Sequence, residues 1–159
     1  MKIQLLTLFL LVSLTIPAWA RLGETEDQLI ARYGKEIHKQ KNEANGQQVG
    51  WTDLLFGKSG FQIEVMLFNG VSSKETFWKT AGDETTDDEI KTLLNDNAQD
   101  HAWNKEAPED SQGISRKWQR DDGAVAGFES GRFYVKAKEL IDAEAAAYKA
   151  AHAASLEGF

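Results

Sequence analysis

The clearest pattern in the chain is an alternation over 61–67, where every second residue is hydrophobic. A period of two is typical of a β-strand that buries one face. Asn69-Gly70 follows directly and is a strong hairpin signal, so 71–79 should return as an antiparallel strand. The range 51–56 predicts another strand just before this pair, and a turn separates the two.

The second half of the chain carries a similar pattern in shorter pieces. The range 114–120 predicts a strand that leads into an Asp122-Gly123 turn. The ranges 124–129 and 132–138 predict a hairpin around Ser130-Gly131. The stretches 35–48 and 101–113 are polar, so we expect loops there, or a weak hairpin in the first of them.

Two short helices are predicted from capping boxes, in which an N-cap Thr is followed three residues later by Gln or Glu. The first helix follows Thr25 and ends at Gly34, and the second follows Thr86 and ends near Asn95. A third helix is predicted over 137–156, because eight of the twelve residues from 143 to 154 are alanine, the strongest helix former.

The two capping boxes are 61 residues apart, and the turns at 69–70 and 130–131 have the same separation. Identity between the halves is close to nil, so coincidence is one explanation. The other is a tandem repeat in which 21–80 and 81–140 each form a helix and antiparallel strands. We therefore predict one α+β domain over 21–159, with two helix-plus-antiparallel-strand units in one sheet and a C-terminal Ala-rich helix.

This layout resembles the tandem units of the β-lactamase-inhibitor-protein-like group, which small outer-membrane assembly lipoproteins share. The segment from Gln28 to Lys35, QLIARYGK, is also similar to the start of small exported bacterial proteins of uncharacterised function. The chain departs from these patterns in having Glu36 where Pro often follows Gly-Lys, and in lacking the lipid-attachment cysteine. The resemblance implies a non-catalytic envelope or secreted module and transfers no functional residue.

The N-terminal twenty residues have the three-part layout of a secretory signal peptide. Lys2 gives a positive start, an apolar run extends over 5–16, and Ala18-Trp-Ala20 forms a cleavage site. The apolar run is shorter than the roughly 20 residues of a membrane span. We expect cleavage between Ala20 and Arg21, export to the periplasm or the medium, and no membrane association afterwards.

Composition narrows the classes of partner. The chain has 18 Lys and Arg against 25 Asp and Glu, so loss of Lys2 with the signal peptide would give a net charge of −8. An acidic surface disfavours nucleic acid and anionic lipid, because both bind basic surfaces. The absence of cysteine excludes disulfides, thiolate metal sites, cysteine nucleophiles and a bacterial lipid anchor.

No motif for catalysis, for a metal or for a cofactor is assembled in the sequence. The three histidines (His38, His101 and His152) lack the spacing of metal-binding pairs, so solvated surface positions are the simpler interpretation. His101 lies near Asp96 and Asp100, which leaves a weak surface site as the alternative. We therefore predict no metal and no cofactor.

Acidic residues gather at 83–89 and 106–110. Helix capping and solvation account for most of them, since acids stabilise a helix N-terminus. Hydrolysis of a glycan would need two carboxylates held at a fixed separation across a cleft. A small hydrolase of envelope polymer is therefore the alternative enzymatic hypothesis.

Four tryptophans remain after the signal peptide and are the candidate ligand contacts. Trp51 and Trp118 lie inside strand patterns, which favours core packing. Trp78 ends a strand and Trp103 lies in a polar stretch, so we expect both to be partly exposed and rank them first. Aromatic residues are preferred anchors in binding sites.

These observations predict a non-enzymatic binding or inhibitory module of the cell envelope or medium, whose partner is an envelope protein or glycan. Two alternatives stay open, the envelope-polymer hydrolase and a structural subunit of an envelope complex. The binding hypothesis predicts a sheet face with exposed aromatic side chains. The hydrolase predicts two facing acids in a cleft, and the structural subunit predicts a large apolar surface patch.

Overall fold

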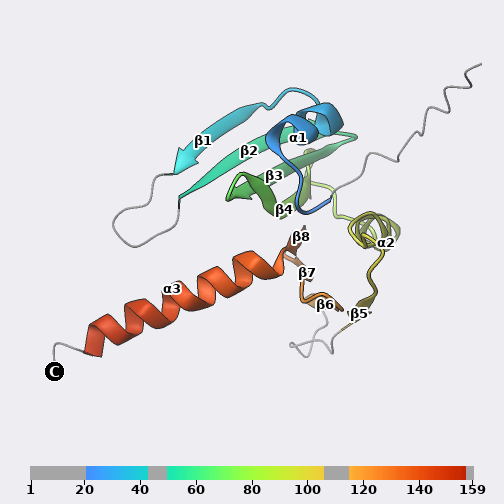
Figure 1. Cartoon of the computed structure of the whole chain (residues 1–159). Helices are drawn as coiled ribbons and strands as arrows, with labels where there is room; N and C mark the ends of the chain where they lie inside the picture. The colour runs from blue at the N-terminus through green and yellow to red at the C-terminus, as the bar shows by residue number, and fades with distance from the viewer. Residues whose placement is uncertain (1–20, 43–49, 106–114, 157–159) are drawn as a thin grey trace, which may run out of the picture.

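The computed structural model describes residues 21–42, 50–105 and 115–156, so the predicted signal peptide up to Ala20 lies outside the described residues. The described chain is an α+β fold with three helices and one eight-stranded antiparallel sheet (Figure 1). The elements in chain order are α1 (Glu26–Tyr33), β1 (His38–Asn42), β2 (Trp51–Lys58), β3 (Phe61–Phe68), β4 (Val71–Lys79), α2 (Asp87–Asp96), β5 (Trp103–Lys105), β6 (Arg116–Arg120), β7 (Val125–Glu129), β8 (Arg132–Lys136) and α3 (Lys138–Leu156).

The strand order is β1-β2-β3-β4-β8-β7-β6-β5, which places the last strand of each run at the centre of the sheet. There β4 pairs antiparallel with β8, so that Phe77 lies opposite Phe133 and Lys74 lies opposite Lys136. A helix precedes each run of four strands. The two tight turns at Asn69-Gly70 and Ser130-Gly131 have similar backbone conformations. All four residues have positive φ angles, between 51° and 82°, as type I′ hairpin turns require.

Both capping boxes form as the sequence predicts. The backbone N–H of Thr25 donates to Gln28 Oε1 at 2.9 Å, and that of Thr86 donates to Glu89 Oε2 at 2.9 Å. The first helix ends at Gly34, whereas the second runs past Asn95 to Asp96. Asn97 ends it instead, because its buried side-chain amide donates to the Leu93 carbonyl at 2.9 Å.

Two expected loops contain strands. The polar residues His38–Asn42 form β1 at one edge of the sheet, and Trp103–Lys105 form β5 at the other edge. An edge strand can be polar because only one of its sides is paired and little of it is buried. Tertiary pairing with β2 and β6 therefore overrides the weak local pattern of these two segments.

The hydrophobic core lies between one face of the sheet and the helices α1 and α2. Leu29 and Tyr33 of α1 belong to the same buried cluster as Ile90 and Leu93 of α2. The Tyr33 and Phe56 rings lie 5.4 Å apart. The sheet residues that are most fully buried in this cluster are Leu54, Phe56, Val65, Phe133 and Val135.

The third helix, α3, begins two residues after β8 and lies on the other side of the sheet. Its buried residue Leu140 is outside the main core cluster and lines a groove with Met66 and Phe68, whose side chains face away from α1 and α2. The later turns of α3 extend away from the strands (Figure 1), and every side chain from Glu144 to Ala153 is exposed. Within the described residues, no helix has the length and apolarity needed to cross a membrane.

Candidate functional site

On the side of the sheet opposite α1 and α2, aromatic and basic side chains of the two central strands lie close together. Similar pairs occur on the core side, where the Lys79 ammonium lies 4.6 Å from the centroid of the Phe61 ring. The pairing register of the strands shows which residues lie on the side opposite α1 and α2. Directly paired residues have side chains on the same face, and successive residues along a strand have side chains on opposite faces. We call the side opposite α1 and α2 the open face. The members used below are Trp51, Asp53, Met66, Phe68, Lys74, Thr76, Trp78, Gly127, Arg132, Tyr134 and Lys136.

Trp78 lies at one end of the open face, on β4, with its side chain half-buried. The guanidinium carbon of Arg132, on the adjacent strand β8, lies 4.9 Å from the centroid of the Trp78 ring. This is cation–π distance, and the contact favours this orientation of the indole. Trp78 therefore presents an aromatic surface beside a positive charge.

Tyr134 lies next to this pair, near the middle of the sheet. Its ring passes directly over Gly127 of the neighbouring strand, since a Cβ atom at position 127 would lie only 2.4 Å from Tyr134 Cζ. Glycine is needed here for this close approach rather than for its backbone angles. The absence of a side chain at 127 lets the phenol ring lie flat, half-buried, across β7.

Trp51 lies at the opposite end of the open face and is half-buried, which differs from the core position expected of it. Its indole N–H donates to Asp53 Oδ2 at 2.9 Å, and the Asn42 side chain donates to the same oxygen at 2.7 Å. With Met66 and Phe68, Trp51 forms the sheet side of a groove of about 290 Å³. The helix side of that groove comes from Leu140, Ala143, Glu144 and Ala147 of α3.

The other two tryptophans face the core side of the sheet. Trp118 is 8% exposed and packs with Phe133, with ring centroids 6.3 Å apart. Trp103 is half-buried against the same core, and its indole N–H donates to the Leu94 carbonyl at 2.9 Å. The structure thus places Trp78 and Trp51 on the open face and Trp103 and Trp118 on the side of α2.

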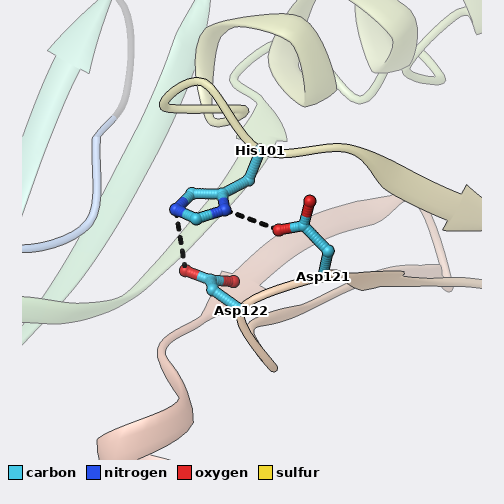
Figure 2. A group of neighbouring side chains, drawn as sticks. All are labelled: His101, Asp121 and Asp122. Atoms are coloured by element: carbon cyan, nitrogen blue, oxygen red, sulfur yellow. Dashed lines mark hydrogen bonds and ion pairs between the residues drawn. The ribbon is translucent and has the colours of Figure 1, made fainter.

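A second group of polar side chains gathers around His101, at the sheet end where β6 turns into β7 (Figure 2). His101 Nδ1 lies 2.5 Å from Asp121 Oδ1, and Nε2 lies 3.8 Å from Asp122 Oδ2. These acids come from the predicted turn rather than from the sequence neighbours of His101. The Ala102 N–H also bonds to Asp121, and this bond is the main reason why the pKa of Asp121 is lowered.

This group is a poor match for a metal site. Figure 2 shows the imidazole ring lying between the two carboxylates, with a different ring nitrogen facing each, whereas one ion takes a single nitrogen of a histidine. Both oxygens of Asp122 also accept hydrogen bonds from buried Arg120, at 2.8 and 2.6 Å. The Arg120 bonds hold the pKa of Asp122 down, to about 2. The cluster therefore ties the segment before β5 to the β6–β7 turn.

Glu75 is a desolvated acid, but it lies in the core. Burial is the main cause that raises its pKa, and the Tyr33 hydroxyl donates to its Oε2 at 2.9 Å. Glu75 does not line the grooves that contain Trp51, Gln99 or Tyr134. The acids at 106–110 lie outside the described residues, so the paired-carboxylate hydrolase stays a hypothesis without an observed cleft.

Sequence reasoning missed Tyr134, Arg132, Lys136 and Lys74 as surface candidates. The signal for the first three is the alternation within 132–136, where hydrophobic Phe133 and Val135 separate them. Lys74 joins them only through the β4–β8 pairing. Comparison with protein-family models, with characterised proteins and with solved structures finds no match to this chain.

Proposed function

We propose that this protein is a non-enzymatic binding or inhibitory module that acts through the open face, in the periplasm or the medium. The observation that carries the proposal is the row formed by Trp78, Arg132 and Tyr134 across the two central strands. Aromatic and arginine side chains dominate the energetics of protein interfaces. Their rings lower the entropy lost on binding, because few rotamers have to be frozen.

The arrangement of the strands supports the proposal. A strand pair at the centre of a sheet has no free backbone edge, so a ligand would contact side chains rather than add a strand. The helices α1 and α2 cover one side of this wide antiparallel sheet, whereas only the first turns of α3 contact the other side, which leaves much of it available. We propose accordingly that the partner lies across β4 and β8.

We also propose that the fold consists of two helix-plus-four-strand units joined through β4 and β8. The symmetric strand order and the 61-residue spacing of the capping boxes and turns support this interpretation. The same layout is what the resemblance to β-lactamase-inhibitor-protein-like modules implies. Export of the chain is proposed from the N-terminal pattern alone.

The experiment is affinity capture with residues 21–159 from envelope and culture-medium fractions, compared across three proteins. These are the unchanged chain, Trp78→Ala, and Lys91→Ala as a control on the exposed side of α2. A stoichiometric protein partner that is retained by the control and lost with Trp78→Ala would support the proposal. Equal capture by all three would overturn the assignment of the open face.

The hydrolase alternative is tested on the same material. Incubation of the chain with isolated cell-wall and capsular polymer should give no soluble fragments if the module is purely a binder. Release of fragments would overturn the non-enzymatic proposal. A variant of Glu75 would not be informative here, since its core position means that its loss affects folding first.

A further inference from the structure

The centre of the open face holds an electrostatic conflict. Lys74 and Lys136 are directly opposite each other on β4 and β8. Like charges at paired positions destabilise a sheet. The open-face positions of these two strands, both fully described, carry these lysines and Arg132 but no acid. These two central strands are therefore basic in a chain with net charge −7, and the nearest acids on the same face lie on the flanking strands, with Glu64 opposite Thr76 and Glu129 opposite Arg132.

A carboxylate from α3 compensates for this charge. Glu144 pairs with one of the two lysines, with its two oxygens 2.8 and 3.1 Å from the Lys136 ammonium. Lys74, Lys136 and Glu144 line a groove of about 310 Å³ together with Tyr134. The chain itself thus shows what the site accepts, which is a carboxylate placed beside an aromatic ring.

The helix that supplies this carboxylate is weakly held. Leu140 is its buried anchor, and every side chain from Glu144 to Ala153 is exposed. The contact with Met66 and Phe68 leaves an open groove of about 290 Å³ rather than a packed interface. Exposed ion pairs such as Lys136–Glu144 contribute little to stability, so an outside carboxylate can compete with it.

We propose that the open face binds an acidic peptide segment of a partner protein, and that α3 is a displaceable cover whose Glu144 occupies the site in the free protein. The partner's carboxylate would take the place of Glu144 on Lys136, in the groove that Lys74 also lines, while its hydrophobic side chains contact Tyr134 and Trp78. This inference rests on the proposed function and adds the chemistry of the partner. The cover lowers apparent affinity, because only the open fraction of molecules can bind.

The test uses a fluorescein-labelled peptide that alternates glutamate with leucine, and a matched peptide with glutamine in place of glutamate. Anisotropy titrations of residues 21–159 at low salt should show binding of the first peptide only. Glu144→Gln should tighten binding about two- to fivefold, which is the range expected from loss of an exposed ion pair. Lys136→Gln should weaken it about fivefold or more.

Asp142→Asn is the matched control. It makes the same charge change on the same helix, but Asp142 pairs with Lys138 rather than with the lysines of the sheet. This variant should leave affinity unchanged. If Asp142→Asn and Glu144→Gln tighten binding equally, net charge explains the effect and the cover is refuted.

Movement of the cover has its own readout. The chain has no cysteine, so spin labels can be placed at Lys91→Cys on α2 and Ala150→Cys on α3. The glutamate peptide should shift or broaden the distance distribution between these labels, and the glutamine peptide should not. An unchanged distribution in the presence of bound peptide would overturn the displacement of α3.

The peptide titrations test the displaceable cover, the acidic partner and the binding face separately. Loss of binding in Trp78→Ala and Lys136→Gln, without tightening in Glu144→Gln, would refute the cover but keep the binding face. Failure of the unchanged chain and of Glu144→Gln to bind the glutamate peptide would refute the acidic partner. In that case, capture of another partner that depends on Trp78 would still support the proposed function.

Discussion

The two faces of the sheet differ in burial and in polarity, and the five residues of β8 alternate between these two faces. Phe133 and Val135 face the helices α1 and α2 and are 0% exposed. Arg132, Tyr134 and Lys136 face the other way and remain partly or fully exposed. Buried hydrophobic packing is thus concentrated on one face of the sheet, and the other face presents its side chains toward solvent and α3.

The largest loss of unfolding free energy should come from a substitution on the core face of the sheet. Phe133→Ala should lower the free energy of unfolding by about 3–5 kcal/mol, because it removes a fully buried ring and leaves a cavity next to Phe77 and Trp118. Equilibrium urea unfolding measures this value. Tyr134→Ala changes the next residue, on the open face, and should cost about 1 kcal/mol. Similar losses for both variants would contradict the division between the faces.

A smaller loss of unfolding free energy is expected at the ion pair between buried Arg120 and Asp122. Arg120 is 6% exposed and donates two hydrogen bonds to Asp122. Asp122→Ala should therefore cost about 2 kcal/mol, the value typical of hydrogen bonds to charged groups. Asp121→Ala is the control, because Asp121 is half exposed and bonds to His101 and the Ala102 N–H rather than to buried Arg120.

The same pair gives a pH dependence of known sign. The Arg120 bonds lower the pKa of Asp122 from 3.8 to about 2. The unfolded chain therefore takes up this proton at a higher pH than the folded protein. Stability from the pair is present above pH 3.8 and is lost as the pH falls toward 2. In urea unfolding at acid pH, the Asp122→Ala variant should lack this part of the decline.

Glu75 should make the free energy of unfolding depend on pH with the opposite sign, with a slope of about 1 kcal/mol per pH unit. Burial raises its pKa above the ordinary 4.5, so the folded protein keeps the proton after the unfolded chain has lost it. Stability therefore falls as the pH rises from 4.5 toward the raised pKa of the folded protein. Glu75→Gln removes this titration and should flatten the pH profile from urea unfolding.

The matched control for this prediction is Glu64→Gln, an equivalent change at an exposed position of β3. It should keep the slope of the unchanged chain, because Glu64 lies at the surface and takes no part in the buried contact between Tyr33 and Glu75. The carbonyl oxygen of a neutral amide at position 75 can still accept a hydrogen bond from the Tyr33 hydroxyl. A steeper slope in Glu75→Gln would contradict the assignment of the buried proton.

The core face could be predicted from local pattern to a much greater extent than the open face. Alternation over 61–67 identifies β3 and its buried side, and the capping boxes locate both short helices. The edge strand β5 was not predicted, and β1 was predicted only as part of a weak hairpin within 35–48, because polar residues gain their strand conformation from pairing with β2 and β6. Local propensity carries no record of such pairing.

The candidate site was found only in part for a related physical reason. Trp78 and Trp51 were named from the sequence, but the face on which they lie depends on register. Trp103 illustrates the limit, since contact with Leu94 of α2 turns its indole toward the core. Lys74 and Lys136 become neighbours through a pairing between residues 62 positions apart, which no local motif encodes.

The smallest effect should come from the outer turns of α3, which separates the cover of the open face from the stable core. A chain that ends at Ala147 loses turns whose described side chains are all exposed, so its free energy of unfolding should change by no more than about 0.5 kcal/mol. Far-ultraviolet circular dichroism should show the lost helix, while urea unfolding stays nearly the same. Leu140→Ala should be measurably less stable, because Leu140 is 5% exposed. A large loss from the truncation would mean that α3 is part of the cooperative core rather than a cover held by one hydrophobic anchor.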